Sequence, residues 1–389
     1  MLSRRSFLIG GGTITLGSLL GGCGSQSQAL RVLLLQGSIP PQVLQLFRQK
    51  LPQNPSMSFK PESQLRDLWK LLESWQTDDL DSKGLKRLIG QIPLINRQRS
   101  QKVDLVTLGD AWLAKAIQEQ LIEPLPLELI PSWQKLPSRW QNLVKRDGQG
   151  NLTEQGQIWA APYRWGTTLI AYDSEQFKKL GWTPQDWSDL WRTELRHRIA
   201  VVDQPREVIG LTLKKLGYSY NETDLSQVQS LTSELLALQK QVKYYSSQYY
   251  LQPLLVGDVW LSVGWSSDIL PLLARNRKIK AVIPPSGTSI WSDVWVKPKR
   301  KKENSSLLSE LTKQWIDFCW QDQPANKISL LTDGASPIIY QVENLSPKIK
   351  ENHLLLIDKN IMDKSEFIEP LSSKTNQQYD SMWRKMREA

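Results

Sequence analysis

Short apolar runs alternate with longer amphipathic segments along most of the chain. The first apolar run, Arg31–Leu35, precedes a segment, Pro41–Leu51, in which apolar residues recur at helical spacing. The same order recurs at Val103–Leu108 and Ala111–Leu121. Five further strand-like runs follow at Thr168–Tyr172, Ile199–Val202, Val242–Tyr244, Val259–Val263 and Ala281–Ile283. Because strands that alternate with helices form βα units, this pattern predicts an α/β fold with largely parallel sheets.

Two polar stretches interrupt the alternation, and both are expected to be loops: Thr77–Gly84 and Arg146–Gln157. After the second stretch, IWAAPYRWGTTLIAYD begins a new series of βα units at Ile158. A chain of 389 residues is long enough for two domains with separate cores. The two series therefore predict two lobes with a cleft between them, which is a common place for a ligand.

The N-terminal segment, MLSRRSFLIGGGTITLGSLLGGC, has the pattern of an export signal. A basic start at Arg4 and Arg5 is followed by a mildly apolar stretch. This stretch is shorter than the roughly 20 residues that a membrane-spanning helix needs, so it indicates a signal peptide. The run Ser3–Leu8 is similar to a twin-arginine export motif.

The end of this segment, Leu20–Cys23, resembles a bacterial lipobox, in which the cysteine is acylated and becomes the new N-terminus. We therefore expect residues 1–22 to be a signal peptide, Cys23 to carry lipid and residues 23–29 to form a short tether to the membrane surface. The alternative is a plain secretory signal in which Cys23 has no role.

Composition excludes little beyond this. The net charge is +10, and the one dense basic run, KPKRKKEN at Lys297–Asn304, is interpreted as a solvated loop rather than a nucleic-acid patch. The other cysteine, Cys319, lies in the apolar helical pattern WIDFCW. A single thiol cannot form an internal disulfide, so we expect Cys319 to be a small buried hydrophobic residue.

Motifs of catalysis are missing from the sequence. There is no G-x-S-x-G, no H-E-x-x-H and no Gly-Lys pair to end a phosphate-binding loop. The two histidines, His197 and His353, have no obvious partners for a metal, so neither metal nor cofactor is expected. These observations favour binding over catalysis. A carboxylate pair for sugar hydrolysis has no fixed spacing, so an exported hydrolase stays an alternative.

Tryptophan is abundant, with 17 residues against 10 tyrosines and 6 phenylalanines. Two tryptophans stand close to acids after apolar runs: Trp265 near Asp268, and Trp291 near Asp293. An aromatic face beside a carboxylate suits an organic cation, because the ring attracts the ammonium group and the carboxylate accepts its hydrogen bonds. The alternative is that each ring only packs and each aspartate faces water.

The junction between Ile199–Val202 and the next helix-like segment has two explanations. Asp203 or Gln204 can cap the helix, Pro205 suits its first position, and Glu207 lies in the first turn, where the helix dipole favours negative charge. The end of such a strand, facing a cleft, is also where α/β proteins hold ligands.

From about Trp159 to Pro298 the chain resembles the spermidine/putrescine-binding proteins of bacterial ABC importers. The matching stretches, in the family's order and spacing, are PYRWGTTLIAYD, DQPREVIGLTLKKLGYS, GDVWLSVGWSSD and PSGTSIWSDVWVKP. Weaker matches, SIPPQVLQLF and VDLVTLGDAWLAKAI, extend the resemblance toward the N-terminus.

The resemblance implies a type II periplasmic binding protein fold, with a mixed, mostly parallel sheet flanked by helices in each of two lobes. The first lobe would comprise residues 30–166 and about 292–338, and the second lobe residues 167–291 and about 339–389. A monomer of this kind would close about a hinge on a polyamine and deliver it to a membrane permease.

The resemblance also implies roles for individual residues. Glu207 matches an acid that holds a ligand ammonium group, Trp265 and Trp291 match aromatic walls, and Asp293 matches the acid beside the second wall. It further implies that Asp203 caps the helix and that Arg206 pairs with a neighbouring carboxylate.

The chain departs from the family's pattern at several positions. Gln204 stands where a second acid is usual, and a late glutamine falls at about Glu369. Leu35, Ser38, Gly109, Ala111 and the region of Ala335 replace side chains of the family's site, although Asp110 and Trp112 stand beside two of them. The expected ligand-binding residues are Glu207, Trp265, Trp291, Asp293, Gln204, Asp110, Trp112 and Glu369. The alternatives for the ligand are a shorter diamine, another amine-bearing solute or a different small molecule. The alternative for the protein is an exported protein of this fold with an assembly or interaction role.

Overall fold

The computed structural model describes residues 29–76, 103–299 and 308–388. Within them a large sheet has the strand order β2-β1-β3-β12-β7-β10-β8-β9, with β11 beside β7 and with β4 and β13 beside β12. Its strands are β1 (Ala29–Leu35), β2 (Ser56–Glu62), β3 (Leu105–Gly109), β4 (Ile122–Glu123), β7 (Ala161–Asp173), β8 (Ile199–Val201), β9 (Val242–Tyr245), β10 (Leu261–Trp265), β11 (Ile279–Val282), β12 (Ser289–Pro298) and β13 (Glu366–Phe367). A separate pair consists of β5 (Lys145–Arg146) and β6 (Gln157–Ile158).

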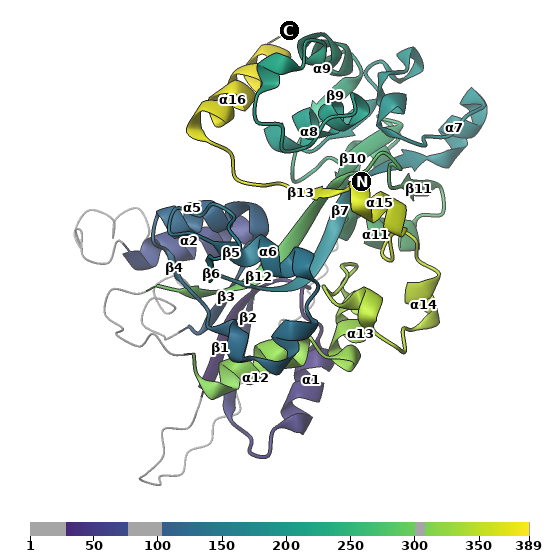
Figure 1. Ribbon diagram of the computed structural model, residues 1–389. Coiled ribbons are helices and arrows are strands. Elements are labelled where there is room, and N and C mark those ends of the chain that lie inside the picture. Colours follow the sequence, from purple (N-terminus) through teal and green to yellow (C-terminus); the bar gives the residue numbers. More distant parts are fainter. Residues whose placement is uncertain (1–28, 77–102, 300–307, 389) are drawn as a thin grey trace, which may run out of the picture.

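The sheet carries two lobes (Figure 1). We call the portion built on β1, β2 and β3 the first lobe, and the portion built on β8, β9 and β10 the second lobe. In the first lobe β1 lies between β2 and β3 and is parallel to both. In the second lobe β8 lies between β9 and β10 and is parallel to both. The predicted α/β fold with largely parallel strands is confirmed.

Strand β7 runs through both lobes. Its first half pairs antiparallel with β12, from Ala161 opposite Trp295 to Thr167 opposite Ile290. Its second half pairs antiparallel with β10, beginning with Thr168 opposite Trp265. The chain thus passes from one set of strands to the other between Thr167 and Thr168. Long strands that cross from lobe to lobe bring side chains of both lobes to one place.

Helices flank both parts of the sheet. They are α1 (Pro41–Lys50), α2 (Leu65–Gln76), α5 (Leu113–Gln118), α6 (Ser138–Val144), α7 (Ser174–Leu180), α8 (Pro205–Lys215), α9 (Leu231–Gln239), α10 (Gln252–Leu255), α11 (Ser266–Arg275), α12 (Glu310–Cys319), α13 (Asp322–Leu331), α14 (Pro347–Lys350), α15 (Lys359–Lys364) and α16 (Ser373–Arg387). Figure 1 shows α8, α9 and α16 with the second lobe and α1, α2, α5 and α12 with the first.

Apolar periodicity explains how these helices attach. Helix α2 buries Trp69 and Trp75 together with three leucines at helical spacing. Helix α16 is capped by Ser372, whose side chain accepts a hydrogen bond from the backbone N–H of Thr375. It packs on α8 and α9 and buries Tyr379 in the core of the second lobe. The C-terminal helix therefore belongs physically to the second lobe.

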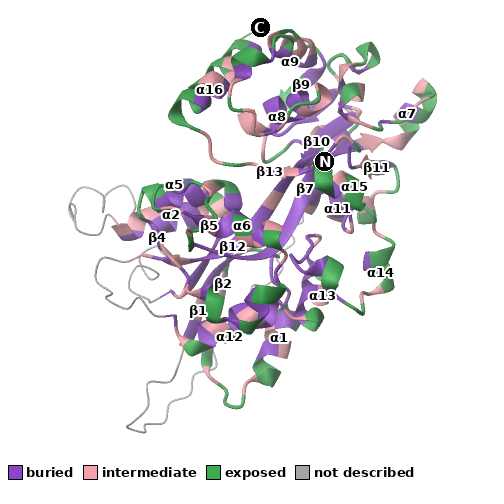
Figure 2. Ribbon diagram, viewed as in Figure 1, coloured by how far each residue is buried: buried purple, intermediate pink, exposed green. Residues whose placement is uncertain are grey.

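Buried residues line both faces of the sheet (Figure 2). One hydrophobic cluster includes Trp295 and Trp315 and extends from the first lobe to part of the second; the other lies between β8, α8, α9 and α16. Cys319 is 1% exposed at the end of α12, which confirms the expected small buried hydrophobic residue. The lobe boundaries expected from the sequence stay a prediction.

Several local predictions differ from the structure. Strand β10 begins at Leu261 rather than Val259, and β11 spans Ile279–Val282 rather than starting at Ala281. Strands β2 and β12 were not among the predicted runs, because polar residues interrupt their apolar pattern. Lys297 lies in β12 and pairs with Glu123, so the basic run does not begin in a solvated loop.

Other expectations fall outside the described residues. They are the loop at residues 77–84, residues 300–304 of the basic run, the signal peptide at residues 1–22, the lipidated Cys23 and all of the tether except its last residue. No helix among residues 29–76, 103–299 and 308–388 is long and apolar enough to span a membrane.

Candidate functional site

Glu207 is brought to the junction of the lobes by the turn after β8. Helix α8 begins at Pro205, its N-cap residue Gln204 makes no side-chain capping bond, and Glu207 lies in the first turn. The side chain turns inward, and only 5% of the residue is exposed. Its two carboxylate oxygens accept hydrogen bonds from two other elements: Ser289 Oγ of β12 at 2.6 Å and Trp265 Nε1 of β10 at 3.3 Å.

Among the described residues, the carboxylate of Glu207 has no cation as a hydrogen-bonding partner. Burial raises its pKa, and the hydrogen bonds from Ser289 and Trp265 and the charge of Arg206 oppose this rise. None of the ion pairs found among the described residues includes Glu207. A buried carboxylate with only neutral hydrogen-bond donors attracts a cationic group strongly.

Trp265 forms a partly open aromatic surface beside Glu207. It is the last residue of β10 and the N-cap of α11, and it is half-buried. Its backbone N–H donates to the hydroxyl of Tyr250 at 3.1 Å, and that hydroxyl donates to Asp268 at 2.9 Å. The ring of Tyr250 lies edge-on to the indole, with 6.2 Å between the ring centroids. These contacts fix the orientation of the indole that meets Glu207.

Trp291 lies across the neighbouring strand. A Cβ atom added at Gly166 would be 2.4 Å from Cζ2 of Trp291, so only glycine leaves room for the ring at this place. Ser289, Trp291 and Asp293 alternate along β12 and therefore lie on one face of the sheet. That face runs from the Glu207 carboxylate, held by Ser289, past the indole of Trp291 to Asp293.

Asp293 is paired with a cation of the chain itself. Its Oδ2 atom lies 2.7 Å from Nε and 2.6 Å from Nη2 of Arg164, and both residues are buried. Burial lowers the pKa of the Arg164 guanidinium, but the charge of Asp293 raises it further, so it lies above its usual value. The guanidinium carbon is 5.5 Å from the ring centroid of Trp291. A ligand contact of Asp293 stays a prediction.

Asp110 connects the end of β3 to β12. It opens the 3-10 turn η1 (Asp110–Trp112) and accepts a hydrogen bond from the backbone N–H of Ser292 at 2.8 Å. Burial raises the pKa of Asp110 to about 7, although the Ser292 N–H and the charge of Arg146 lower it. Trp112, two residues on, is half-buried and lies edge-on to Trp69 at 5.5 Å between ring centroids. This turn replaces the start of the helix expected at Ala111.

Gln204 and Glu369 are exposed and are not hydrogen-bonded to the other expected site residues. Glu369 lines a cavity of about 450 Å³ that lies between α6 and the turn after α8. Arg139, Asn221 and Glu366 also line it. The structure therefore brings Glu207 of α8 and Trp265 of β10 to the face of β12 that carries Ser289, Trp291 and Asp293, and leaves Glu369 in a different cavity.

Two expectations about the start of α8 are wrong. Asp203 does not cap the helix; its carboxylate lies 2.8 Å from Nη1 of Arg387 on α16. Arg206 does not pair with a carboxylate but donates to the backbone carbonyl of Glu369 and to the side-chain oxygen of Asn221, both at 2.9 Å. Because C-terminal residues fold back on α8, Arg387 and Glu369 reach this turn from distant parts of the sequence.

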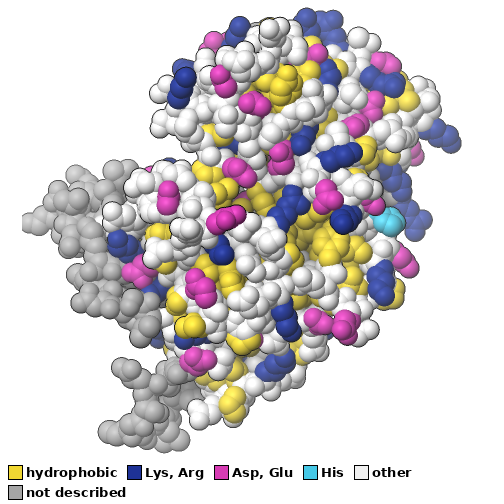
Figure 3. All heavy atoms as spheres, in the orientation of Figure 1, with side chains coloured by type: hydrophobic (Ala, Val, Ile, Leu, Met, Phe, Trp, Pro, Cys, Tyr) yellow, Lys and Arg dark blue, Asp and Glu magenta, His cyan; other side chains and the backbone are white. Residues whose placement is uncertain are grey.

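The two lobes also touch at their surfaces. Gln248 Nε2, after β9, donates to Oε1 of Gln64, before α2, at 3.2 Å. In the space-filling view, both acidic and basic side chains lie around the hollow where the upper and lower parts of the molecule meet (Figure 3).

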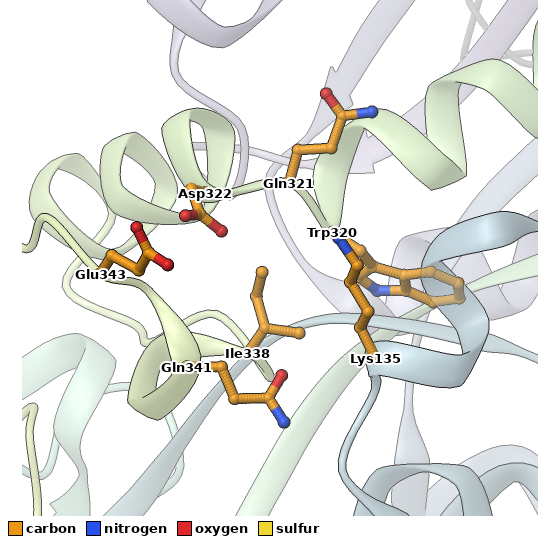
Figure 4. A pocket seen from close by; sticks show the side chains of 7 residues that line it. All are labelled: Lys135, Trp320, Gln321, Asp322, Ile338, Gln341 and Glu343. Atoms are coloured by element: carbon orange, nitrogen blue, oxygen red, sulfur yellow. The ribbon is translucent and has the colours of Figure 1, made fainter.

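Another cavity of about 500 Å³ lies away from these residues, beside α12 and α13 (Figure 4). It is lined by Lys135, Trp320, Gln321, Asp322, Ile338, Gln341 and Glu343. It contains charges of both signs and none of the expected site residues. No group of three or more His, Cys, Asp or Glu side chains that could hold a metal occurs in the described part of the chain.

Sequence reasoning missed three contributors to the site: Arg164, Ser289 and Tyr250. Arg164 and Ser289 were visible in two of the matching stretches, two residues from Gly166 and Trp291 respectively. The alternation along β7 and β12 could have placed them on one face, had the two strands been recognised as neighbours. Tyr250 gave no signal, because it lies in an irregular segment before α10.

Fold and site together define a class: a two-lobed solute-binding protein, with buried acid and indole side chains collected where the lobes join. The model of the bacterial extracellular solute-binding protein family matches residues 100–365. The chain belongs to this family. Since the relatives are substrate-binding transport proteins, it is a binding protein and not an enzyme.

Individual relatives agree with this assignment. The putrescine/cadaverine-binding protein of Pseudomonas aeruginosa is 26% identical over 244 residues, which cover 60% of this chain and 68% of the relative. The spermidine/putrescine-binding periplasmic protein of Salmonella typhimurium is 25% identical over 264 residues, which cover 68% and 72% of the two chains.

The solved structure of the spermidine/putrescine ABC transporter substrate-binding protein PotD from Streptococcus pneumoniae matches with a TM-score of 0.75. The identity is 20%, and the match covers 93% of this chain and 99% of that one. This likeness confirms the type II periplasmic binding fold that the resemblance implied.

Proposed function

We propose that the protein is the solute-binding subunit of an ABC importer and that it takes a small organic cation, such as a polyamine or a related amine, to a membrane permease. The supporting observation is the Glu207 carboxylate, which is buried at the junction of the lobes and accepts hydrogen bonds from the neutral donors Ser289 and Trp265. An ammonium group of the ligand would supply the cationic partner that this carboxylate lacks.

The ligand body would lie along the indole rings of Trp265 and Trp291. Both rings are half-buried, so each keeps an accessible surface. Methylene groups pack well against indole faces, and an ammonium group beside them gains a cation–π contact. Asp110 and Trp112 would bound the site from the first lobe, while Asp293 shares its charge with Arg164. Gln204 and Glu369 are proposed as contacts at the exposed edge.

The names of the relatives support an amine ligand. The similar proteins from Pseudomonas aeruginosa and Salmonella typhimurium are named for binding putrescine, cadaverine or spermidine. We propose a periplasmic location for this chain, by export along the twin-arginine route, and anchoring through lipid on Cys23. The mature protein would act as a monomer and meet the permease from the membrane surface.

Calorimetric titration of the mature protein with putrescine and with spermidine tests the proposal. Binding heat is expected with at least one of them, together with a rise in the melting temperature, since a ligand at 100 times its Kd adds about 2.7 kcal/mol to the stability. 1,4-Butanediol, which has the length of putrescine without its charges, is the matched control and should give neither. Absence of heat and of a thermal shift with both amines would contradict a polyamine ligand.

A further inference from the structure

Arg164 is a charged side chain of the site to which the proposed function gives no ligand contact. We propose that this arginine fills, from within the protein, the position that a second ligand cation would occupy, so that the site is built for a monoamine cation rather than a diamine. This proposal rests on the proposed function, because it concerns the charge of the ligand that the same site takes.

The guanidinium is held firmly at Asp293. Two of its nitrogens donate to Oδ2 of Asp293 at 2.7 and 2.6 Å, and Nη1 donates to the backbone carbonyl of Thr332 at 3.2 Å. The Arg164 side chain is 6% exposed and that of Asp293 is 3% exposed. Because its three nitrogens are all engaged, Arg164 is not a free anion-binding group, and Asp293 is not a free carboxylate.

Arg164 also takes the aromatic contact. In the pairing of β7 and β12, Arg164 lies opposite Asp293 and Gly166 lies opposite Trp291. The guanidinium carbon is 5.5 Å from the ring centroid of Trp291, which is a cation–π distance. A carboxylate next to an indole face is the combination that recognises an organic cation. At this end of the strand face, Trp291 and Asp293 form a site for a cation, and Arg164 of the same chain occupies it.

The other end of the strand face is different. Glu207 is hydrogen-bonded to Ser289, which lies four residues before Asp293 on β12. At the usual rise per residue of a strand, Ser289 and Asp293 are about 13 Å apart. The hydrogen-bond donors of Glu207 are neutral, and no ion-pair partner is found for it in the part of the chain that the structure describes. A ligand cation would therefore be stabilised beside Glu207, whereas Asp293 is already neutralised by Arg164.

A second ammonium group would meet a positive charge. A diamine whose first nitrogen binds Glu207 and whose chain follows Trp291 would bring its second nitrogen toward Arg164. Asp268 and Asp333 are the other acids whose charges act on Arg164. Asp268 already accepts a hydrogen bond from Tyr250, and Asp333 is half-buried near the Arg164 guanidinium. The ligand class that fits best is a primary or secondary monoamine with an uncharged body that covers the indoles.

The test compares n-butylamine with putrescine, which share a four-carbon chain and differ in one charge. In the unmodified mature protein, calorimetry is expected to show that n-butylamine binds at least as tightly as putrescine. Putrescine binding more than threefold tighter would overturn the inference and leave the proposed amine-binding function intact. Failure of both amines, and of spermidine, to bind would overturn the proposed function itself, and the inference with it.

Variants of the pair supply a second test. Arg164→Met frees the Asp293 carboxylate and is expected to shift the putrescine to n-butylamine affinity ratio by at least tenfold in favour of putrescine. Arg164→Lys keeps the charge and should keep the unmodified preference. An unchanged ratio in Arg164→Met would overturn the inference.

The double variant Arg164→Met, Asp293→Asn removes both charges and leaves no buried ion without a partner, so it serves if Arg164→Met alone does not fold. Without the guanidinium, it should shift the putrescine to n-butylamine affinity ratio toward putrescine, by less than Arg164→Met because the Asp293 carboxylate is also gone. An unchanged ratio in the double variant would overturn the inference.

Discussion

Replacement of Glu207 by glutamine removes one charge from the site with almost no change in shape. In the structure the carboxylate accepts from Trp265 Nε1 at 3.3 Å and from Ser289 Oγ at 2.6 Å. A glutamine can keep both contacts, because its carbonyl oxygen can accept from the indole N–H while its amide group donates to the serine hydroxyl. The variant should therefore fold as well as the unmodified protein.

The expected effect on affinity follows from the charge alone. A hydrogen bond to a charged group contributes about 1.5–3 kcal/mol, so Glu207→Gln should weaken amine binding by about 10- to 150-fold. Removal of a buried carboxylate that lacks a cationic partner should leave the melting temperature of the free protein unchanged or slightly higher. The two effects have opposite directions, which separates loss of binding from loss of folding.

Calorimetric titration with the tightest-binding amine, together with thermal melts of the free protein, measures both quantities. Asp380→Asn on the exposed face of α16 is the matched control, since it also exchanges a carboxylate for an amide. Its affinity should equal that of the unmodified protein. An affinity of Glu207→Gln within threefold of the unmodified value would refute the role assigned to Glu207.

Binding should also depend on pH through this residue. Burial raises the pKa of Glu207 above its usual value. The carboxylate must be ionised to hold an ammonium group, so the affinity of the unmodified protein should fall as the pH drops from neutral toward this raised pKa. Glu207→Gln should lose this dependence, which gives the first prediction an independent check.

Three further predictions concern other residues. The pKa of Asp110 is raised from 3.8 to about 7, so the stability that its carboxyl contributes is lost as the pH rises between these values. Asp110→Asn should therefore raise the melting temperature above pH 7 and flatten the dependence of the melting temperature on pH. Melting curves that match those of the unmodified protein would contradict this. Trp265→Ala should weaken amine binding by about 2- to 30-fold, since a cation–π contact contributes about 0.5–2 kcal/mol, whereas an equal loss in Trp265→Phe would point to the indole N–H instead. Cys23→Ala should move the protein from the membrane fraction to the soluble fraction; an unchanged distribution would argue against lipid on this cysteine.

The sequence predicted much of the fold because most of its strands and helices have a regular apolar pattern within their own residues. Strand β1 and helix α1 appear within one or two residues of the expected ranges. Strand β12 was not predicted, because its serine, aspartate and lysine interrupt the apolar run. Those polar residues make sense only once β12 is placed between β3 and β7, where one of its faces meets the second lobe.

The site was only partly predictable for a related reason. Glu207, Trp265 and Trp291 could be chosen from local stretches. The structure places Glu207 against Trp265 and against Ser289, which shares a face of β12 with Trp291. The pairing of Arg164 with Asp293 joins residues 129 positions apart and depends on the exact register of two antiparallel strands. Likewise, Asp203 met Arg387 across 184 positions, which no capping rule could foresee.

A crystal structure of the mature protein grown with n-butylamine would examine the chemistry of the site itself. The amine nitrogen should lie within hydrogen-bonding distance, about 2.7–3.2 Å, of a carboxylate oxygen of Glu207, with its carbon chain against Trp265 and Trp291. Amine density confined to the cavity at Glu369 or to the cavity beside α12, with the surroundings of Glu207 unchanged, would contradict the assignment of this carboxylate as the ligand's partner.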